Sequence, residues 1–123
     1  MATGLRQNIP YTFRAQCSSD VVAGDYIYPD NVGLLKKARA DSPNTMPCIG
    51  YVLKKVNGYA YCTREYIKNV DDPVIGPQFI SQTEAGKLQS TLPIGEQTVI
   101  QQVATGLNTK LLVSIDNETT LRS

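Results

Sequence analysis

The sequence predicts an all-β domain, a small β-barrel or β-sandwich of short antiparallel strands. Helical periodicity is weak throughout, glycines recur at turn spacing, and Asn57-Gly58 separates two runs rich in β-branched and aromatic residues. The best helical candidate, residues 32–42, is short and stops before Pro43. We therefore predict a strand over residues 34–38.

The domain organisation follows from length and polarity. A chain of 123 residues fits one domain and can bury a core without disulfides or metal. We assign residues 17–116 to the β domain, 1–16 to an extended N-terminal arm and 117–123 to a polar C-terminal tail that frays. For the N-terminal arm, residues 1–16, the alternative that it forms an edge strand of the same domain stays open.

The clearest local signal is the hairpin around Asn57-Gly58. Both residues accept positive φ, as a two-residue type I′ turn requires. Such a turn places Val56 opposite Tyr59. Continuing the register places Leu53 opposite Cys62, so both faces of this strand pair carry apolar residues.

A second hairpin is predicted towards the C-terminus. The segment "TVIQQVAT" alternates apolar and polar side chains, and "KLLVSID" does the same. The intervening "GLN", which begins at Gly106, supplies the predicted turn. The alternation groups Leu111 and Val113 on one face and Leu112 and Ser114 on the other.

The two halves of the chain have similar punctuation. Each half has a glycine turn, a short strand, another glycine turn, a strand and a loop that contains proline. The matched positions are Gly24, Gly33 and Ile49 in the first half and Gly76, Gly86 and Ile100 in the second. A degenerate internal repeat explains this pattern. Ordinary turn spacing in an all-β chain explains it equally well.

Residue types that usually carry catalysis are scarce. The sequence has no histidine, the commonest general base and metal ligand near neutral pH, and no glycine-rich phosphate motif. We expect no enzymatic activity, no cofactor and no metal site. The remaining acid–base option is a carboxylate pair such as Asp71 with Glu65. Asp71-Asp72 itself is interpreted as an Asp-Pro turn.

Charge and hydropathy argue against nucleic acids and membranes as binding partners. Twelve Lys and Arg residues against eleven Asp and Glu residues give a net charge of +1, which does not supply the basic field of a nucleic-acid-binding protein. No apolar run approaches the roughly 20 residues that span a bilayer, and no secretory signal is recognisable. We expect synthesis in a cytoplasm. We also expect Cys17, Cys48 and Cys62 to be reduced, with a Cys48–Cys62 disulfide as the less favoured alternative.

Two segments carry a resemblance to a known family. The run "AGDYIYPDNVGLLKKARADSPNTMPCIGYVL" resembles small virion proteins of tailed bacteriophages, in which a glycine-led strand pair precedes an Ile-Gly strand. The run "GPQFISQTEAGKLQSTLP" is similar to a later segment of the same proteins. Residues of this run that match are Gly76, Phe79, Ile80, Ser81, Thr83, Gly86, Leu88 and Pro93. Residues 104–107 depart from the family pattern, because the glycine there is shifted.

The resemblance implies a structural protein of the virion. The expected role is that of a decoration, or cement, protein on the outer surface of a phage capsid, with the major capsid protein and further copies of itself, as a trimer, for partners. The alternative is a receptor- or carbohydrate-binding domain of a tail or head fibre, in which Tyr26, Tyr28 and Tyr59 would stack on sugar rings. We expect the capsid or subunit contacts at Arg6, Pro10, Tyr11, Phe13, Arg14, Tyr26 and Tyr28.

Overall fold

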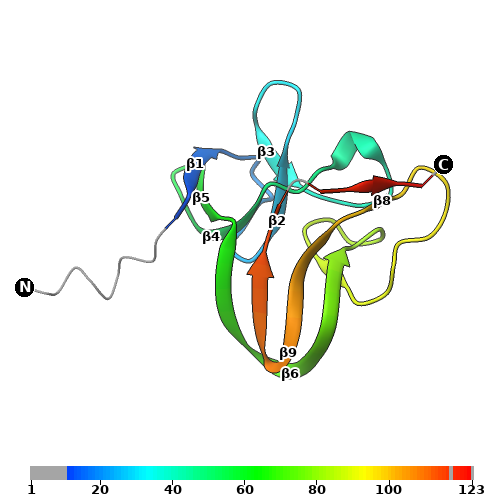
Figure 1. Cartoon of the computed structure of the whole chain (residues 1–123). Helices are drawn as coiled ribbons and strands as arrows, with labels where there is room; N and C mark the ends of the chain where they lie inside the picture. The colour runs from blue at the N-terminus through cyan, green and yellow to red at the C-terminus, as the bar shows by residue number, and fades with distance from the viewer. Residues whose placement is uncertain (1–10, 117, 123) are drawn as a thin grey trace, which may run out of the picture.

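Ten strands and one short 3₁₀ turn, Pro43–Thr45, form the described part of the chain, residues 11–116 and 118–122 of a computed structural model (Figure 1). The strands are β1 (Phe13–Gln16), β2 (Tyr26–Pro29), β3 (Leu35–Lys37), β4 (Gly50–Val56), β5 (Tyr59–Thr63), β6 (Glu65–Ile80), β7 (Leu88–Gln89), β8 (Val99–Ile100), β9 (Gln102–Ser114) and β10 (Thr120–Leu121). The predicted all-β class is confirmed as an open, sandwich-like arrangement of antiparallel sheets and not as a closed barrel. In these residues no helix has the length and apolar character needed to cross a membrane.

A five-stranded sheet in the order β1-β5-β4-β2-β3 forms the body of the molecule. The predicted β4–β5 hairpin is confirmed, because Asn57 and Gly58 have φ values of 52° and 80° and Val56 lies opposite Tyr59. The predicted pairing of Leu53 with Cys62 is wrong. A bulge between Val52 and Lys54 shifts the register, and Val52 takes the position opposite Cys62.

A long two-stranded ribbon, β6 with β9, extends from the body. Residues 65–69 pair with 110–114, and 74–79 pair with 102–108. Between these two halves the register shifts and the ribbon bends back, so that β6 forms an outer arc and β9 an inner arc (Figure 1). Because Asp71 and Asp72 lie at this register break, the predicted Asp-Pro turn is realised as a bend within one strand.

The second predicted hairpin is wrong. Gly106 lies within β9. Of the two segments that were expected to pair with each other, residues 102–105 and 110–114 pair with β6 instead, and Val99 and Ile100 pair with β10. A Cβ at Gly106 would lie 2.4 Å from the carbonyl carbon and oxygen of Val74, so this glycine permits close contact between the strands. The predicted alternation is correct, since Leu111 and Val113 are buried while Leu112 and Ser114 are exposed.

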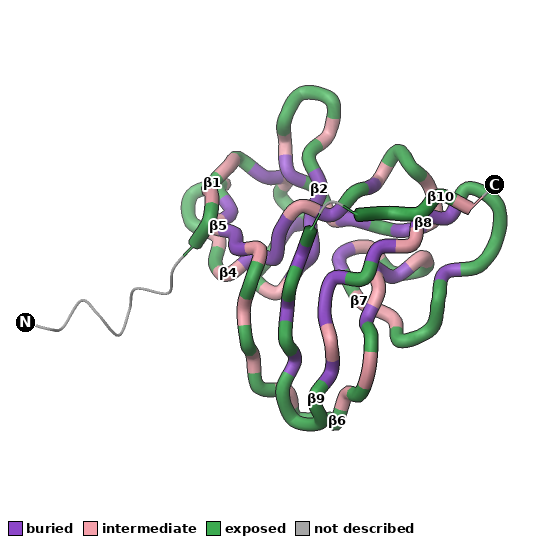
Figure 2. The backbone as a smooth tube through the Cα atoms, viewed as in Figure 1, coloured by how far each residue is buried: buried purple, intermediate pink, exposed green. Residues whose placement is uncertain are grey.

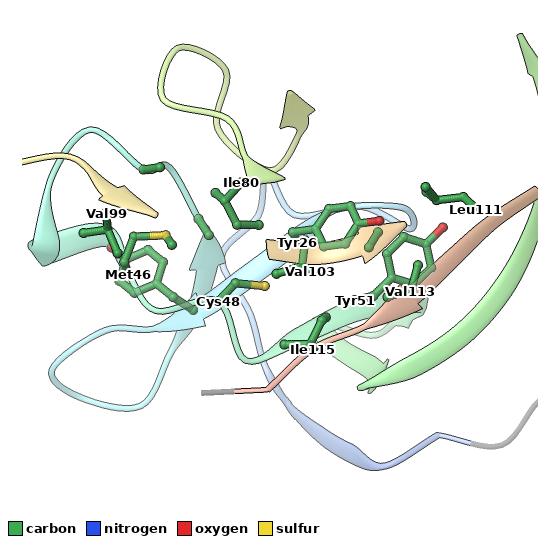
Figure 3. Packing of buried hydrophobic residues seen from close by; sticks show 14 residues of the cluster. Tyr26, Met46, Cys48, Tyr51, Ile80, Val99, Val103, Leu111, Val113 and Ile115 are labelled. Carbon is green, nitrogen blue, oxygen red and sulfur yellow. The ribbon is translucent and has the colours of Figure 1, made fainter. Parts of the chain in front are cut away.

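Two clusters of buried side chains stabilise the fold. The larger lies between the body and the inner face of the ribbon, and Figure 3 shows it running from Met46 and Val99 to Leu111 and Val113. The smaller lies on the opposite face of the five-stranded sheet and includes Val52. The body is therefore covered on both faces, whereas exposed residues alternate with covered ones along the ribbon (Figure 2).

The two glycine-punctuated segments form adjacent hairpins, β2–β3 and the end of β6 with β7. The Tyr26 N–H donates to the Gly86 carbonyl, and the Gly86 N–H donates to the Ala38 carbonyl. Asp25 is fully buried at this junction, where its Oδ2 accepts from the Val22 N–H and lies 3.8 Å from the Lys37 Nζ. The similar punctuation of the two halves thus corresponds to two hairpins in contact.

Buried Gln101 fastens the body to the end of the ribbon. Its Oε1 accepts from the Cys48 N–H at 2.8 Å, and its Nε2 donates to the carbonyls of Cys48 and Asp116 at 2.9 and 2.8 Å. Because Gln101 and Cys48 are buried, the amide replaces the hydrogen bonds that water would otherwise provide to the Cys48 backbone.

Strand pairing extends past both predicted limits of the β domain, while residues 1–10 of the expected arm and residues 117 and 123 of the expected tail lie outside the described residues. Residues 13–16 form β1 and pair with β5, so the edge-strand alternative is correct for this part of the expected arm. Within the expected tail, Thr120 and Leu121 pair with β8. The cysteines were predicted correctly, since all three are free and buried. Burial raises the pKa of the Cys48 and Cys62 thiols to about 12.

Candidate functional site

The predicted contact residues are distributed over several environments. Arg6 and Pro10 lie outside the described residues. Tyr11 and Arg14 are exposed, as a contact role requires. Phe13 is half-buried and packs against the smaller core cluster, so it mainly anchors β1.

The prediction that Tyr26 and Tyr28 are exposed is wrong. Only 3% of Tyr26 and 8% of Tyr28 remain accessible, because both rings pack in the larger core cluster. Tyr26 lies against Tyr51, which stacks on Tyr66 of the ribbon at a centroid distance of 5.5 Å. The Tyr26 hydroxyl is buried without a hydrogen-bond partner, and this burial raises its pKa strongly.

Another group of tyrosines remains open at the β1–β5 edge of the body. Tyr61 lies across from Arg14 on one side and from Lys54 on the other. The Lys54 Nζ lies 4.8 Å and the Arg14 Cζ 5.8 Å from its ring centroid, and the Tyr11 ring meets it edge-on. Arg14 also lies over Tyr59, at 5.0 Å. We name these five residues the tyrosine platform, a surface that combines aromatic rings with two cations.

The outward face of the ribbon carries two apolar cross-strand pairs. Ile67 lies opposite Leu112 on one half of the bend, and Ile75 lies opposite Leu107 on the other half. Their exposed fractions are 63% and 38% for the first pair and 77% and 57% for the second. We name them the ribbon apolar pairs. Facing aliphatic side chains stabilise a sheet best when something covers them, and no described residue of the chain covers these four.

Polar side chains frame the first pair. Glu65 lies opposite Ser114 at one end, and Lys110 donates a 2.8 Å hydrogen bond to Asn69 at the other. The surface around the pair is hollowed by a shallow depression of about 440 Å³ along the edges of Glu65, Ile67 and Leu112. An apolar centre with a polar rim is the arrangement found at protein–protein interfaces.

Sequence reasoning missed this face. The signal was present in the run "KLLVSI", in which consecutive apolar residues place Leu112 on the face opposite Leu111 and Val113. Such a run indicates a strand that is covered on both sides, either by its own chain or by a partner. The partner strand β6 was not predicted because it contains Pro73 and Pro77, and proline argues against a long strand.

The carboxylates do not form a catalytic pair. Glu65 and Asp71 are six residues apart on the same extended strand, which separates them by about 20 Å. In residues 11–116 and 118–122, no group of three or more cysteine or acidic side chains is arranged to hold a metal ion. The arrangement is suited to binding through apolar, aromatic and cationic contacts.

Comparison of the chain with protein-family models, curated proteins and solved structures gave no match.

Proposed function

We propose that this chain is a structural virion protein that decorates and stabilises a bacteriophage capsid from the outside. The observation that supports the proposal most strongly is the pair of uncovered aliphatic contacts on the outward face of the ribbon. Full burial of one Ile or Leu side chain contributes about 1.5–3 kcal/mol. Two such pairs, on a ribbon that extends from a body with its own buried core, provide a binding surface that does not compete with folding.

Stabilisation then follows from differential affinity. A protein that binds the mature shell more tightly than its open or expanding forms shifts the equilibrium towards the mature shell. The proposed location is the capsid surface, and the proposed partners are the major capsid protein and further copies of the chain, as a trimer. Several ribbons in one assembly raise the overall affinity through effective concentration.

Fibre-tip binding of sugars has weaker support. Of the three tyrosines expected to stack on sugar rings, Tyr26 and Tyr28 are buried in the core. The third, Tyr59, is exposed, but Arg14 already lies over its ring. A sugar would have to displace that cation before it could stack.

The test is sedimentation of the purified chain with heads of the phage that encodes it, prepared without this protein. We expect saturable co-sedimentation and a higher temperature of head disruption in its presence. The matched control uses heads that already carry the protein. Labelled chain added to these heads should exchange only slowly with the bound copies. Heads that take up none of the chain and gain no heat resistance would contradict the proposal.

A further inference from the structure

Two exposed regions of opposite charge lie far apart on the same molecule. The first is the tyrosine platform with Arg14 and Lys54, at the β1–β5 edge of the body. The second is the bend of the ribbon, where Asp71 and Asp72 are both exposed; we name these two residues the acidic bend. In Figure 1 the bend lies at the far end of the ribbon from β1 and β5, so the two regions of one chain do not meet.

Among the described residues, no ion pair involves a charged side chain of either region. The ion pairs found within residues 11–116 and 118–122 join Lys36, Lys37, Arg39 and Lys87 to Asp25, Asp30 and Asp41. None of them includes a residue of the platform or of the acidic bend. Lys110, the cation on β9 nearest the bend in the register, donates its hydrogen bond to Asn69 and to neither carboxylate.

The geometry of the two regions matches as well as their charge. Arg14, Tyr61 and Lys54 lie in a row across three adjacent strands, which spaces the two cations about 10 Å apart at their Cα atoms. The acidic bend is a narrow protrusion with two adjacent carboxylates, and Pro73 restricts the backbone that follows it. Because the bend is the tip of the ribbon (Figure 1) and the cations of the platform are exposed, the bend of one copy can approach the platform of another.

We propose that the acidic bend of one copy of this chain docks on the tyrosine platform of the next copy. The contact is head-to-tail, because it joins two different surfaces, and such contacts close into rings when the rotation between copies permits. With a rotation of 120° the ring is a trimer. The net charge of +1 leaves little general repulsion between copies. This inference does not depend on capsid binding, and it is tested without capsids.

The test is the mass of the full chain in solution, measured by light scattering and sedimentation velocity at low ionic strength and in about 1 M salt, where the Debye length is about 3 Å. We expect an oligomer at low salt that dissociates at high salt. The variants R14E/K54E and D71K/D72K should each weaken self-association about a hundredfold, because like charges then face each other. All four side chains are exposed, so the variants should fold and retain the parent's circular dichroism.

The combined variant R14E/K54E/D71K/D72K distinguishes a direct contact from a change in net charge. It reverses both sides of the contact and should restore the oligomer. The matched control E84K/E96K changes net charge as D71K/D72K does, at exposed loop positions, and should keep the parent's mass. Three results would each overturn the inference. They are a parent that is monomeric at its highest soluble concentration, an R14E/K54E or D71K/D72K variant with the parent's mass, and a combined variant that stays monomeric.

Discussion

The body and the ribbon use the same secondary structure in opposite ways. The five-stranded sheet of the body has buried side chains on both faces, so its residues mostly serve folding. The ribbon has a covered inner face and an outward face with four large aliphatic side chains exposed. The comparison indicates that folding of this chain is complete without the outward face, which is therefore free for binding. We therefore expect substitutions in the body to lower stability, and substitutions on the outward face of the ribbon to weaken binding.

The largest expected loss of stability comes from a substitution in the body. In Gln101→Ala, the buried N–H and C=O of Cys48 lose their partners and a cavity remains, so we expect a loss of about 3 kcal/mol or more in the free energy of unfolding. Urea denaturation measures it. The control is the adjacent Gln102→Ala, where the side chain is exposed and the change should stay within about 0.5 kcal/mol. Equal losses in the two variants would break the distinction between covered and exposed positions.

A smaller effect is expected at the junction of the two hairpins. Gly86 has a φ of +79°, and a Cβ there would lie 3.0 Å from the Asp25 Oδ1. We expect Gly86→Ala to cost about 2 kcal/mol. Gly33→Ala is the matched control, because its φ is +86° with open space around the Cβ, so it should cost about 1 kcal/mol from backbone strain alone. Thermal unfolding would contradict the assignment if Gly33→Ala were the more damaging change.

Removing the buried Tyr26 hydroxyl should raise stability, in contrast to the two substitutions above. Because it has no hydrogen-bond partner, Tyr26→Phe should stabilise the chain by about 1 kcal/mol near neutral pH. Tyr26, Cys48 and Cys62 all have raised pKa values in the fold. Stability should be complete below the ordinary thiol pKa of about 9 and fall as the pH rises towards 12, since only the unfolded chain releases these protons there.

Urea titrations across this alkaline range measure the slope. In Tyr26→Phe the loss above about pH 10 should be shallower than in the parent, by up to about 1.4 kcal/mol per pH unit. The same slope in both proteins, or a Tyr26→Phe variant less stable than the parent at neutral pH, would show that this hydroxyl has a partner in solution.

The sequence was sufficient for the local elements of the body. Asn57-Gly58 determines its own turn through positive φ, and the strand at 35–37 follows directly after the positive-φ glycine Gly33. The ribbon could not be predicted in the same way. Its register depends on pairs that are 23 to 49 residues apart. Pro77 is tolerated because, among the described strands, β6 pairs with β9 alone at that point.

The candidate surfaces were predicted only in part. Arg14 and Tyr11 are exposed where β1 pairs with β5, but Tyr26 and Tyr28 are buried because the ribbon covers β2. Alternation within one strand cannot show which face a distant ribbon covers. The ribbon apolar pairs could be recognised only after the cross-strand register was known.

The most direct test of the central claim is binding of ribbon variants to phage heads that lack the protein. Ile67→Thr/Leu112→Thr and Ile75→Thr/Leu107→Thr preserve strand propensity and should change stability by no more than about 0.5 kcal/mol. Val32→Thr is the control, an exposed aliphatic residue in a turn of the body. The account predicts that each ribbon variant loses at least tenfold in affinity for heads while the control binds like the parent. Ribbon variants that bind heads as tightly as the parent would contradict it.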